Sequence, residues 1–232
     1  MRLSTSPPGK PLPQQSGDLA EQYQTSTRNL GFTKRYAKAH ETHYAPWVQQ
    51  LVADAPLHLD ELPRVRLPAP DLGLLSAPLG EAIARRRSGR SYAGQPITAA
   101  HLSTILYAAN GVRPAALARG PHPSRNVTNA GNLGSVEMYP VVMDVAGVEP
   151  GMYHFDCVDH DLALVARGHF GTWLSEVVLF QIEFGEAAVG VILTSAVGRL
   201  KAKYGPRGYR FALLDIGHVS QNIYLSATAL SL

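Results

Sequence analysis

The chain has 232 residues, of which 45% are hydrophobic and 17% are charged, and its formal net charge is +3 with a pI near 9.0. These values fit one globular domain with a sizeable core and exclude a fibre. The basic residues form no stripe with interleaved aromatic residues, so we expect no nucleic acid partner. Cys157 is the only cysteine, which excludes an internal disulfide. His40 and His43 are three residues apart, whereas a helical zinc pair needs four, so no metal site is expected.

The N-terminal part of the chain is predicted to differ from the rest. Residues 1–18 are rich in Ser, Pro and Gln and predict a mobile segment. Residues 19–77 predict an arm, helical at first and then extended through several prolines. The beginning of the chain lacks a signal-peptide pattern, and the longest nearly apolar run, 187–197, is too short to span a bilayer. We therefore expect a cytoplasmic protein with no membrane partner, whose main domain covers 78–232.

A basic cluster follows a short predicted helix at 79–84. Alone, it fits a solvated helix end, where the helix dipole favours cations. Several guanidinium groups beside a hydroxyl also fit a bound phosphate. The residues by themselves leave both interpretations open. The cluster contains Arg86, Arg87, Ser88 and Arg90.

Residues 98–109 predict a helix that Thr98 caps and Gly111 ends. The segment 112–128 is long, basic and contains proline, so we expect a loop over a site. It leads to the small-residue run 129–135, which alone predicts only a turn.

Strands and helices are interleaved over the following part of the chain. Strands are predicted at 136–145, 151–156, 161–165 and 188–194, with a helix at 169–183. The second and third strands read as a hairpin, and the last as a buried strand. Hairpins in place of regular crossovers indicate the α+β class. The motifs of a Rossmann site, a P-loop and a serine-hydrolase elbow are absent from the sequence.

The stretch 201–222 joins two predicted helices at a break. Gly205-Pro206 ends the first helix, which places Lys203 and Tyr204 at a corner. The second helix begins at about Pro206 and is expected to be largely buried, because its apolar residues occupy more than one face. Its polar residues are spaced three and four apart, close enough to share a partner or a ligand. They are Asp215, His218, Gln221 and Asn222.

Three of these stretches together resemble the SagB-type branch of the flavin-dependent nitroreductase superfamily. That branch includes azoline dehydrogenases, which convert thiazolines and oxazolines in ribosomal peptides to thiazoles and oxazoles. The resemblance covers about 78–232, although Asn129 stands where serine is usual and Gly134-Ser135 where Tyr-Pro is common. It rests on Arg-Arg-Ser-Gly-Arg-Ser-Tyr at 86–92, Asn-Ala-Gly-Asn-Leu at 129–133 and Lys-Tyr-Gly-Pro-Arg-Gly-Tyr-Arg-Phe at 203–211, continued by Gly-His-Val-Ser-Gln-Asn at 217–222.

The resemblance implies a nitroreductase-like α+β fold, with a mostly antiparallel central sheet flanked by helices and a long buried helix at a dimer interface. It implies FMN as the cofactor, with Arg86, Ser88 and Arg90 at the phosphate and ribityl chain and Arg87 near the isoalloxazine edge. It also implies that Lys203, paired with Tyr204, is the catalytic base, whose pKa would be lowered by burial and by Lys201, Arg199 and Arg207. The remaining implied flavin contacts are Asn129, Ala130, Gly131, Asn132, His218, Gln221 and Asn222.

The implied activity is the FMN-dependent oxidation of azolines in a modified precursor peptide. The implied partners are a second copy of the chain and a cyclodehydratase or other biosynthetic enzyme. Two alternatives stay open: an oxidase like those of nonribosomal peptide synthetases or an NAD(P)H-dependent nitro or quinone reductase, and a flavin-free partner subunit of a peptide-modifying complex. Family members also continue beyond the helix in which this chain ends, so a C-terminal segment of the family is expected to be missing here.

Overall fold

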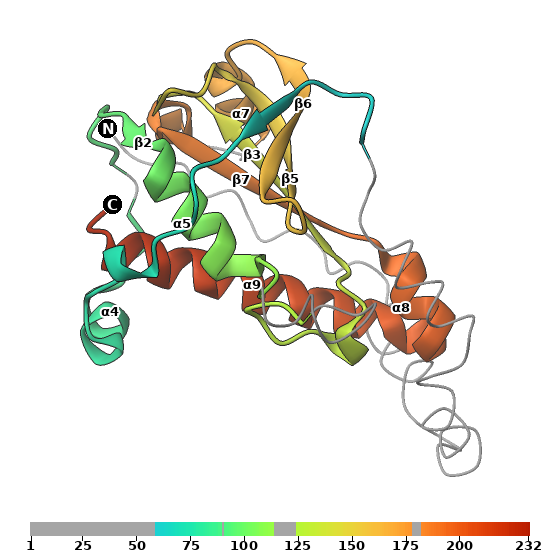
Figure 1. Cartoon of the computed structure of the whole chain (residues 1–232). Coiled ribbons are helices and arrows are strands. Elements are labelled where there is room, and N and C mark those ends of the chain that lie inside the picture. The colour runs from blue at the N-terminus through green and yellow to red at the C-terminus, as the bar shows by residue number, and fades with distance from the viewer. Residues whose placement is uncertain (1–58, 90, 114–123, 178–181) are drawn as a thin grey trace, which may run out of the picture.

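The computed structural model of the chain describes residues 59–89, 91–113, 124–177 and 182–232. The predicted mobile segment 1–18, the helical part of the predicted arm and Arg90 lie outside these ranges. Elements are labelled as in Figure 1.

Five strands form one sheet in the order β1-β6-β5-β3-β7, and each neighbouring pair is antiparallel. β5 and β6 make the predicted hairpin, with Phe155 opposite Leu162. Two further short strands, β2 (Ile97–Thr98) and β4 (Val145–Ala146), pair in parallel. The five strands are β1 (Arg64–Arg66), β3 (Val136–Val142), β5 (Gly151–Asp156), β6 (Asp161–Arg167) and β7 (Val189–Ser195).

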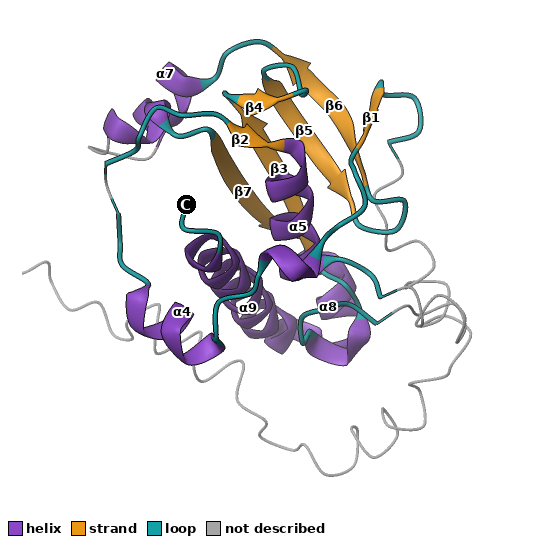
Figure 2. Ribbon diagram, turned by 60° about the vertical axis from the view of Figure 1, so that its left-hand side comes forward, coloured by secondary structure: helices purple, strands orange, loops and turns teal. Residues whose placement is uncertain are grey.

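Helices α5 (Ala99–Asn110) and α9 (Gly208–Ala229) lie side by side against one face of this sheet (Figure 2). The core between them and the strands contains Leu106 of α5, Val219 of α9, Met138 of β3 and Phe155 of β5. The α+β architecture and the antiparallel sheet are confirmed. The other helices within the described residues are η2 (Leu72–Leu74), α4 (Leu79–Arg85), η3 (Ala130–Asn132), α7 (Gly171–Val177), η4 (Ile182–Glu186), α8 (Val197–Tyr204) and η5 (Gly205–Arg207).

α5 forms as its sequence predicts. The Thr98 side chain accepts a hydrogen bond of 3.1 Å from the backbone N–H of His101, as an N-cap does. The predicted apolar stripe is buried against the sheet. It consists of Leu102, Ile105, Leu106 and Ala109.

Three predicted elements differ from the structure. β3 ends at Val142, before the predicted 145, because the amides of Met143 and Asp144 both donate to the carbonyl of Ala188 and the chain bends there. The described part of the predicted helix 169–183 contains only α7 and the start of η4. β7 is half-exposed rather than buried, because among the described residues it forms one edge of the sheet and pairs with β3 on one side.

α9 is buried along one face and not, as predicted, around most of its circumference. Its buried positions Ala212, Asp215 and Val219 recur at helical spacing, with Ala212 packed against Leu200 of α8 and Val219 in the core with α5 and the sheet. On the opposite face Leu213 is 54% exposed and Leu214 57% exposed. The helix begins at Gly208 because 205–207 form a 3-10 turn, with Gly205 at a φ of 61°. Within the described residues, no helix is both long and apolar enough to cross a membrane.

Candidate active site

Two stretches that are about 70 residues apart in sequence meet at one corner of the molecule. Gly131, in the loop before β3, has a φ of 63° and faces the end of α8. A Cβ at Gly131 would lie 2.7 Å from Lys203 Nζ and still closer to Tyr204 Oη. The polar ends of both predicted catalytic side chains therefore lie directly against the Gly131 backbone, where only glycine leaves them room.

The corner is held tightly by the packing of α8 on α9. Gly208 has no space for a side chain, because a Cβ there would lie only 2.6 Å from the carbonyl carbon of Leu200 and from the amide nitrogen of Lys201. The Tyr204 ring packs edge-on against Phe211, with ring centroids 4.7 Å apart. The Lys203 ammonium lies 5.4 Å from the centroid of the Tyr204 ring. The Tyr204 ring is thus fixed by packing, and Lys203 extends over it.

Burial lowers the pKa of Lys203 from its ordinary value. This is the direction that a lysine needs in order to act as a base near neutral pH. The sequence predicted a lower pKa from burial and from three neighbouring cations. Burial alone accounts for the shift in the structure, and one of those cations, Arg199, is paired with Glu137 at 3.1 Å.

Asp215 of α9 anchors the loop that carries Gly131. Its carboxylate accepts hydrogen bonds from the Ala130 N–H at 3.0 Å and from the Ser135 hydroxyl at 3.0 Å. Asp215 is 4% exposed, and this burial raises its pKa against the opposing effects of the two hydrogen bonds and of His218. From the sequence, Asp215 was noted as a polar residue of an apolar helix but was not predicted to belong to the site. An acidic residue among buried apolar positions was the available signal.

The loop departs from the family pattern at Asn129 and at Gly134, and these two residues are joined by a hydrogen bond. The Asn129 side chain accepts from the Gly134 N–H at 3.1 Å, and the Gly134 carbonyl accepts from Arg199 at 2.8 Å. Gly134 has a φ of 55°, and a Cβ there would meet the Arg125 guanidinium at 2.5 Å. A tyrosine at position 134 would collide with Arg125. Neither Arg125 nor Arg199 was predicted to contact this loop, because their contacts arise only when β3, α8 and the loop pack together.

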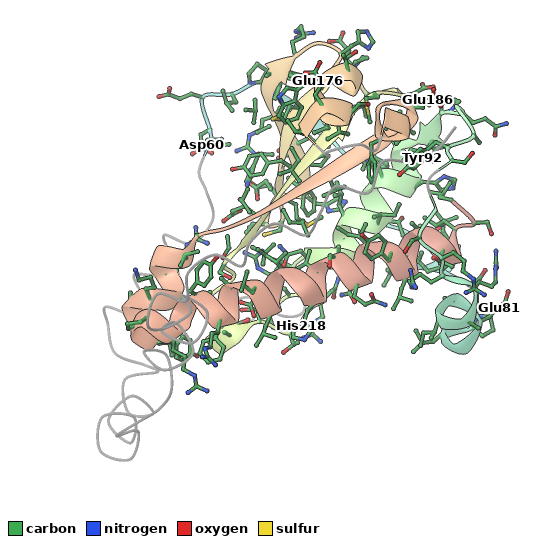
Figure 3. The ribbon with its side chains drawn as sticks, turned by 180° about the vertical axis from the view of Figure 1, so that it is seen from behind. Asp60, Glu81, Tyr92, Glu176, Glu186 and His218 are labelled. Atoms are coloured by element: carbon green, nitrogen blue, oxygen red, sulfur yellow. The ribbon has the colours of Figure 1, made fainter. Side chains whose placement is uncertain are left out.

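The structure separates the polar residues of α9 into two groups. Asp215 and Asn222 face inward, and the Asn222 amide donates to the carbonyl of Ala108 in α5 at 3.3 Å. His218 and Gln221 are exposed, and Figure 3 shows His218 on the side of α9 turned away from the sheet. Within one chain these four residues do not face one common ligand.

The predicted phosphate cluster lies elsewhere, at the end of α4. Arg86 is half-buried and Ser88 is exposed. The Arg87 guanidinium donates to the carbonyls of Ala84 and Arg86, at 2.7 and 2.9 Å, which is the behaviour of a cation at a helix C-terminus. Arg90 lies outside the described residues.

The two halves of the predicted site are far apart within one chain. Arg85 of α4 donates to Ser231 at 3.1 Å, just beyond the C-terminal end of α9. Lys203 lies just before the N-terminal end of α9, and the helix between them has 22 residues, about 33 Å at 1.5 Å per residue. Figure 1 shows α4 and α8 at opposite ends of α9. A single FMN cannot contact both the arginine cluster and Lys203 of the same chain.

Comparisons with known proteins agree with this fold. The profile of the nitroreductase family matches residues 83–232, more than half of the chain. A protein of Methanocaldococcus jannaschii that carries the name of a nitroreductase is 36% identical over 154 residues, which are 66% of this chain and 75% of that protein. The trifolitoxin-processing protein of Rhizobium leguminosarum bv. trifolii is 32% identical over 120 residues, which are 50% of this chain but only 32% of that protein.

Solved structures show the same architecture. A nitroreductase-like protein of Anabaena variabilis superposes with a TM-score of 0.60 at 24% identity, over 73% of this chain and 34% of that one. The microcin synthetase complex of Escherichia coli, solved with truncated pro-MccB17 bound, gives a TM-score of 0.53 at 21% identity, over 63% of this chain and 56% of that one. These two likenesses establish the fold alone. With the family match over 83–232 and the 36% identity to the archaeal relative, the chain belongs to the nitroreductase family.

Proposed function

We propose that this protein is an FMN-dependent dehydrogenase that oxidises azoline rings of a modified peptide to azoles. The observation that carries the proposal is the placement of Lys203 and Tyr204 against the Gly131 backbone. A partly buried lysine beside a small-residue loop supplies a base where backbone, and not bulky side chains, lines one side. The similarity to a trifolitoxin-processing protein supports a peptide as the substrate.

FMN fits the residues of the chain when two copies contribute to one site. Nitroreductase-family members typically bind FMN, and the Arg86 region offers cationic and hydroxyl donors suited to a phosphate. The absence of a side chain at Gly131 lets Lys203 and Tyr204 lie against its backbone, so both polar side-chain ends stand beside the small-residue loop where we propose that the ring binds. Because these two places lie at opposite ends of α9, we propose that the arginine cluster of one copy and the Gly131 corner of a second copy hold the same FMN.

A homodimer is also supported by the exposed apolar surface of α9. This surface extends onto α4 and would be covered by a second α9. Exposed apolar side chains on these two helices are Leu79, Ile83, Tyr209, Leu213, Leu214 and Tyr224.

In the proposed reaction, the neutral amine of Lys203 removes the proton from the azoline Cα. A hydride leaves the adjacent ring carbon, and the ring gains the double bond that makes it aromatic. FMN, when bound, supplies the acceptor for that hydride, and dioxygen then takes up the two electrons. Tyr204, fixed against Phe211, holds the lysine or the ring in place. The partial burial of Lys203 lowers its pKa, which favours the neutral amine that this step needs.

Mass spectrometry tests this proposal directly. The purified full-length protein is incubated with an azoline-bearing peptide, air and added FMN, with and without a cyclodehydratase. We expect each ring to lose two hydrogens. Flavin absorbance without any change in peptide mass would exclude azoline oxidation, and the absence of bound flavin would favour a flavin-free partner subunit.

The reductase alternative has its own support, since the archaeal relative carries the name of a nitroreductase. It predicts consumption of NADPH in the presence of a simple nitroarene. If NADPH is consumed and azoline peptides keep their mass, the reductase is the function.

A further inference from the structure

Arg199 connects the helix that carries Lys203 to the loop that faces Lys203. It lies on α8 four residues before Lys203, so the two side chains share one side of the helix. One nitrogen of its guanidinium, Nη1, donates to the Gly134 carbonyl at 2.8 Å and to Glu137 Oε1 at 3.1 Å. Gly134 is three residues beyond Gly131 in the same loop. A single, largely buried cation therefore joins both sides of the corner.

The far end of this contact is fixed in the centre of the sheet. Glu137 of β3 is 8% exposed, and its second oxygen accepts from His154 Nε2 at 3.0 Å. His154 lies on β5, is 2% exposed and packs with Tyr139 at a ring separation of 5.2 Å. With both carboxylate oxygens occupied, Glu137 cannot rotate without losing a charge-assisted hydrogen bond. The Arg199 guanidinium is thus held by the rigid strands of the sheet.

We propose that Arg199 is a positioning residue, which holds α8 at the separation from the 129–135 loop that places Lys203 Nζ against Gly131. Glu137 of β3 fixes the Arg199 guanidinium by its hydrogen bond, and His154 of β5 fixes Glu137 in turn. The proposal concerns residues outside the predicted site. Its consequence for turnover rests on the proposed function, whereas its consequence for the surroundings of Lys203 does not.

The surroundings of Lys203 can be measured without substrate or flavin. The chain has five lysines, Lys10, Lys34, Lys38, Lys201 and Lys203, so the NMR signals of ¹³C-dimethylated lysines can be assigned, that of Lys203 from Lys203→Arg. In Arg199→Met, we expect the Lys203 amine to become more exposed and to titrate closer to the ordinary lysine value of about 10.4. Arg199→Lys should stay near the wild type, because an ammonium can donate to both oxygens.

Two further variants separate positioning from loss of charge and from loss of fold. Lys201→Met removes a cation from the exposed side of the same helix, and it should shift the Lys203 titration much less than Arg199→Met. Arg199→Met alone leaves the buried Glu137 carboxylate without its cation and is at risk of unfolding. Arg199→Met combined with Glu137→Gln removes both charges, so no unpaired carboxylate is left buried. The Lys203 titration can then be measured in this folded double variant.

Turnover of the azoline peptide gives the second measurement. In folded Arg199→Met/Glu137→Gln, kcat should fall at least about tenfold with KM within about twofold, because Arg199 contributes to the position of the base and not to substrate binding. Arg199→Lys should recover most of kcat. An unchanged Lys203 titration in the folded double variant would overturn the proposal. A wild-type protein without azoline turnover would refute the proposed function, and the lysine titration would still decide the role of Arg199.

Discussion

At Gly131 the backbone takes a conformation that side chains disfavour, and it does so where two functional groups need the space. The atoms that a Cβ would meet are Lys203 Nζ, at the end of a flexible side chain, and Tyr204 Oη, on a ring that packs against Phe211. The lysine end can swing away at little cost to the fold, whereas Tyr204 must shift with its ring. A substitution at Gly131 therefore acts on the site more than on stability.

We predict that Gly131→Ala lowers the free energy of unfolding by about 1 to 2 kcal/mol, the cost of a left-handed alanine, but lowers kcat far more than this loss implies. Thermal melts and azoline turnover measure the two effects. Gly198→Ala is the matched control, since Gly198 is also near this corner, on α8, and has open space for a Cβ. It should leave turnover unchanged and should not lower stability, since alanine is the better helix former. Normal turnover in Gly131→Ala would contradict the placement of the site.

Lys203 and Tyr204 can be distinguished by their variants. Lys203→Ala should retain FMN and the fold, because Lys203 lies at a helix end, and should lose roughly 10²- to 10⁴-fold in turnover, as expected for removal of a positioned base. Tyr204→Phe keeps the packing on Phe211 and should cost less if the hydroxyl only orients the lysine or the ring. Full turnover in a flavin-loaded Lys203→Ala protein would refute the base assignment.

Among the secondary-structure elements, α9 has one face that packs in the core and one face that is exposed to solvent. The inward face packs on α5 and the sheet. It also carries Asp215, whose carboxylate accepts two hydrogen bonds from the 129–135 loop. The outward face exposes the apolar side chains of Leu213, Leu214 and Tyr224 beside the polar His218 and Gln221 in the single chain. The loop is thus held from two helices, by Asp215 of α9 and by Arg199 of α8.

The buried carboxyl of Asp215 has a measurable effect on stability. Because its pKa is raised in the folded state, the folded protein binds the proton more tightly than the unfolded chain does. Stability should therefore decrease as pH rises from below the unfolded value of about 3.9 through the higher folded value. Urea unfolding at several pH values measures this slope. Asp215→Asn keeps an acceptor for Ala130 and should lose the slope.

The control for this measurement is Asp144→Asn, which removes an equal charge at an exposed position and should retain the wild-type slope. If Asp215→Asn and the wild type show the same pH dependence, the aspartate does not titrate differently in the folded protein.

At the scale of the whole molecule, the length of α9 decides how an FMN site can be assembled. The arginine cluster and the Lys203 corner are separated by about 33 Å of helix, 22 residues at 1.5 Å each. A second copy that packs against the exposed face of α9 in the opposite direction would bring one cluster to each corner. Each dimer would then have two sites, and each site would use both chains.

Mixing two inactive variants tests this arrangement. Arg86→Ala/Arg90→Ala should lose FMN, and Lys203→Ala should lose turnover. After the two are unfolded and refolded together, half of the dimers are mixed, and each mixed dimer has one intact site if sites are shared between chains. We expect about a quarter of the wild-type turnover. No recovery in refolded, dimeric mixtures would show that each site belongs to one chain.

A matched pair of surface variants tests the interface itself. Leu214→Glu places a charge on the exposed face of α9 and should give monomers that retain little FMN, as measured by sedimentation and flavin absorbance. Leu72→Glu changes an equally exposed leucine on η2 and should remain dimeric. A dimeric Leu214→Glu protein with full flavin occupancy would place the interface elsewhere.

The sequence by itself determined the local features of this protein. Thr98 predicts its own helix cap, Gly205-Pro206 predicts the corner at which Lys203 and Tyr204 lie, and the alternation around 151–165 predicts a hairpin, because each depends on neighbours within a few residues. The tertiary structure decided what those features meet. In the folded chain Gly131 lies against Lys203, and Asp215 and Arg199 bind the loop that contains Gly131. The arginine cluster lies at the opposite end of α9. It also left β7 at a sheet edge and one face of α9 exposed, since burial depends on which elements become neighbours and not on the pattern within any one of them.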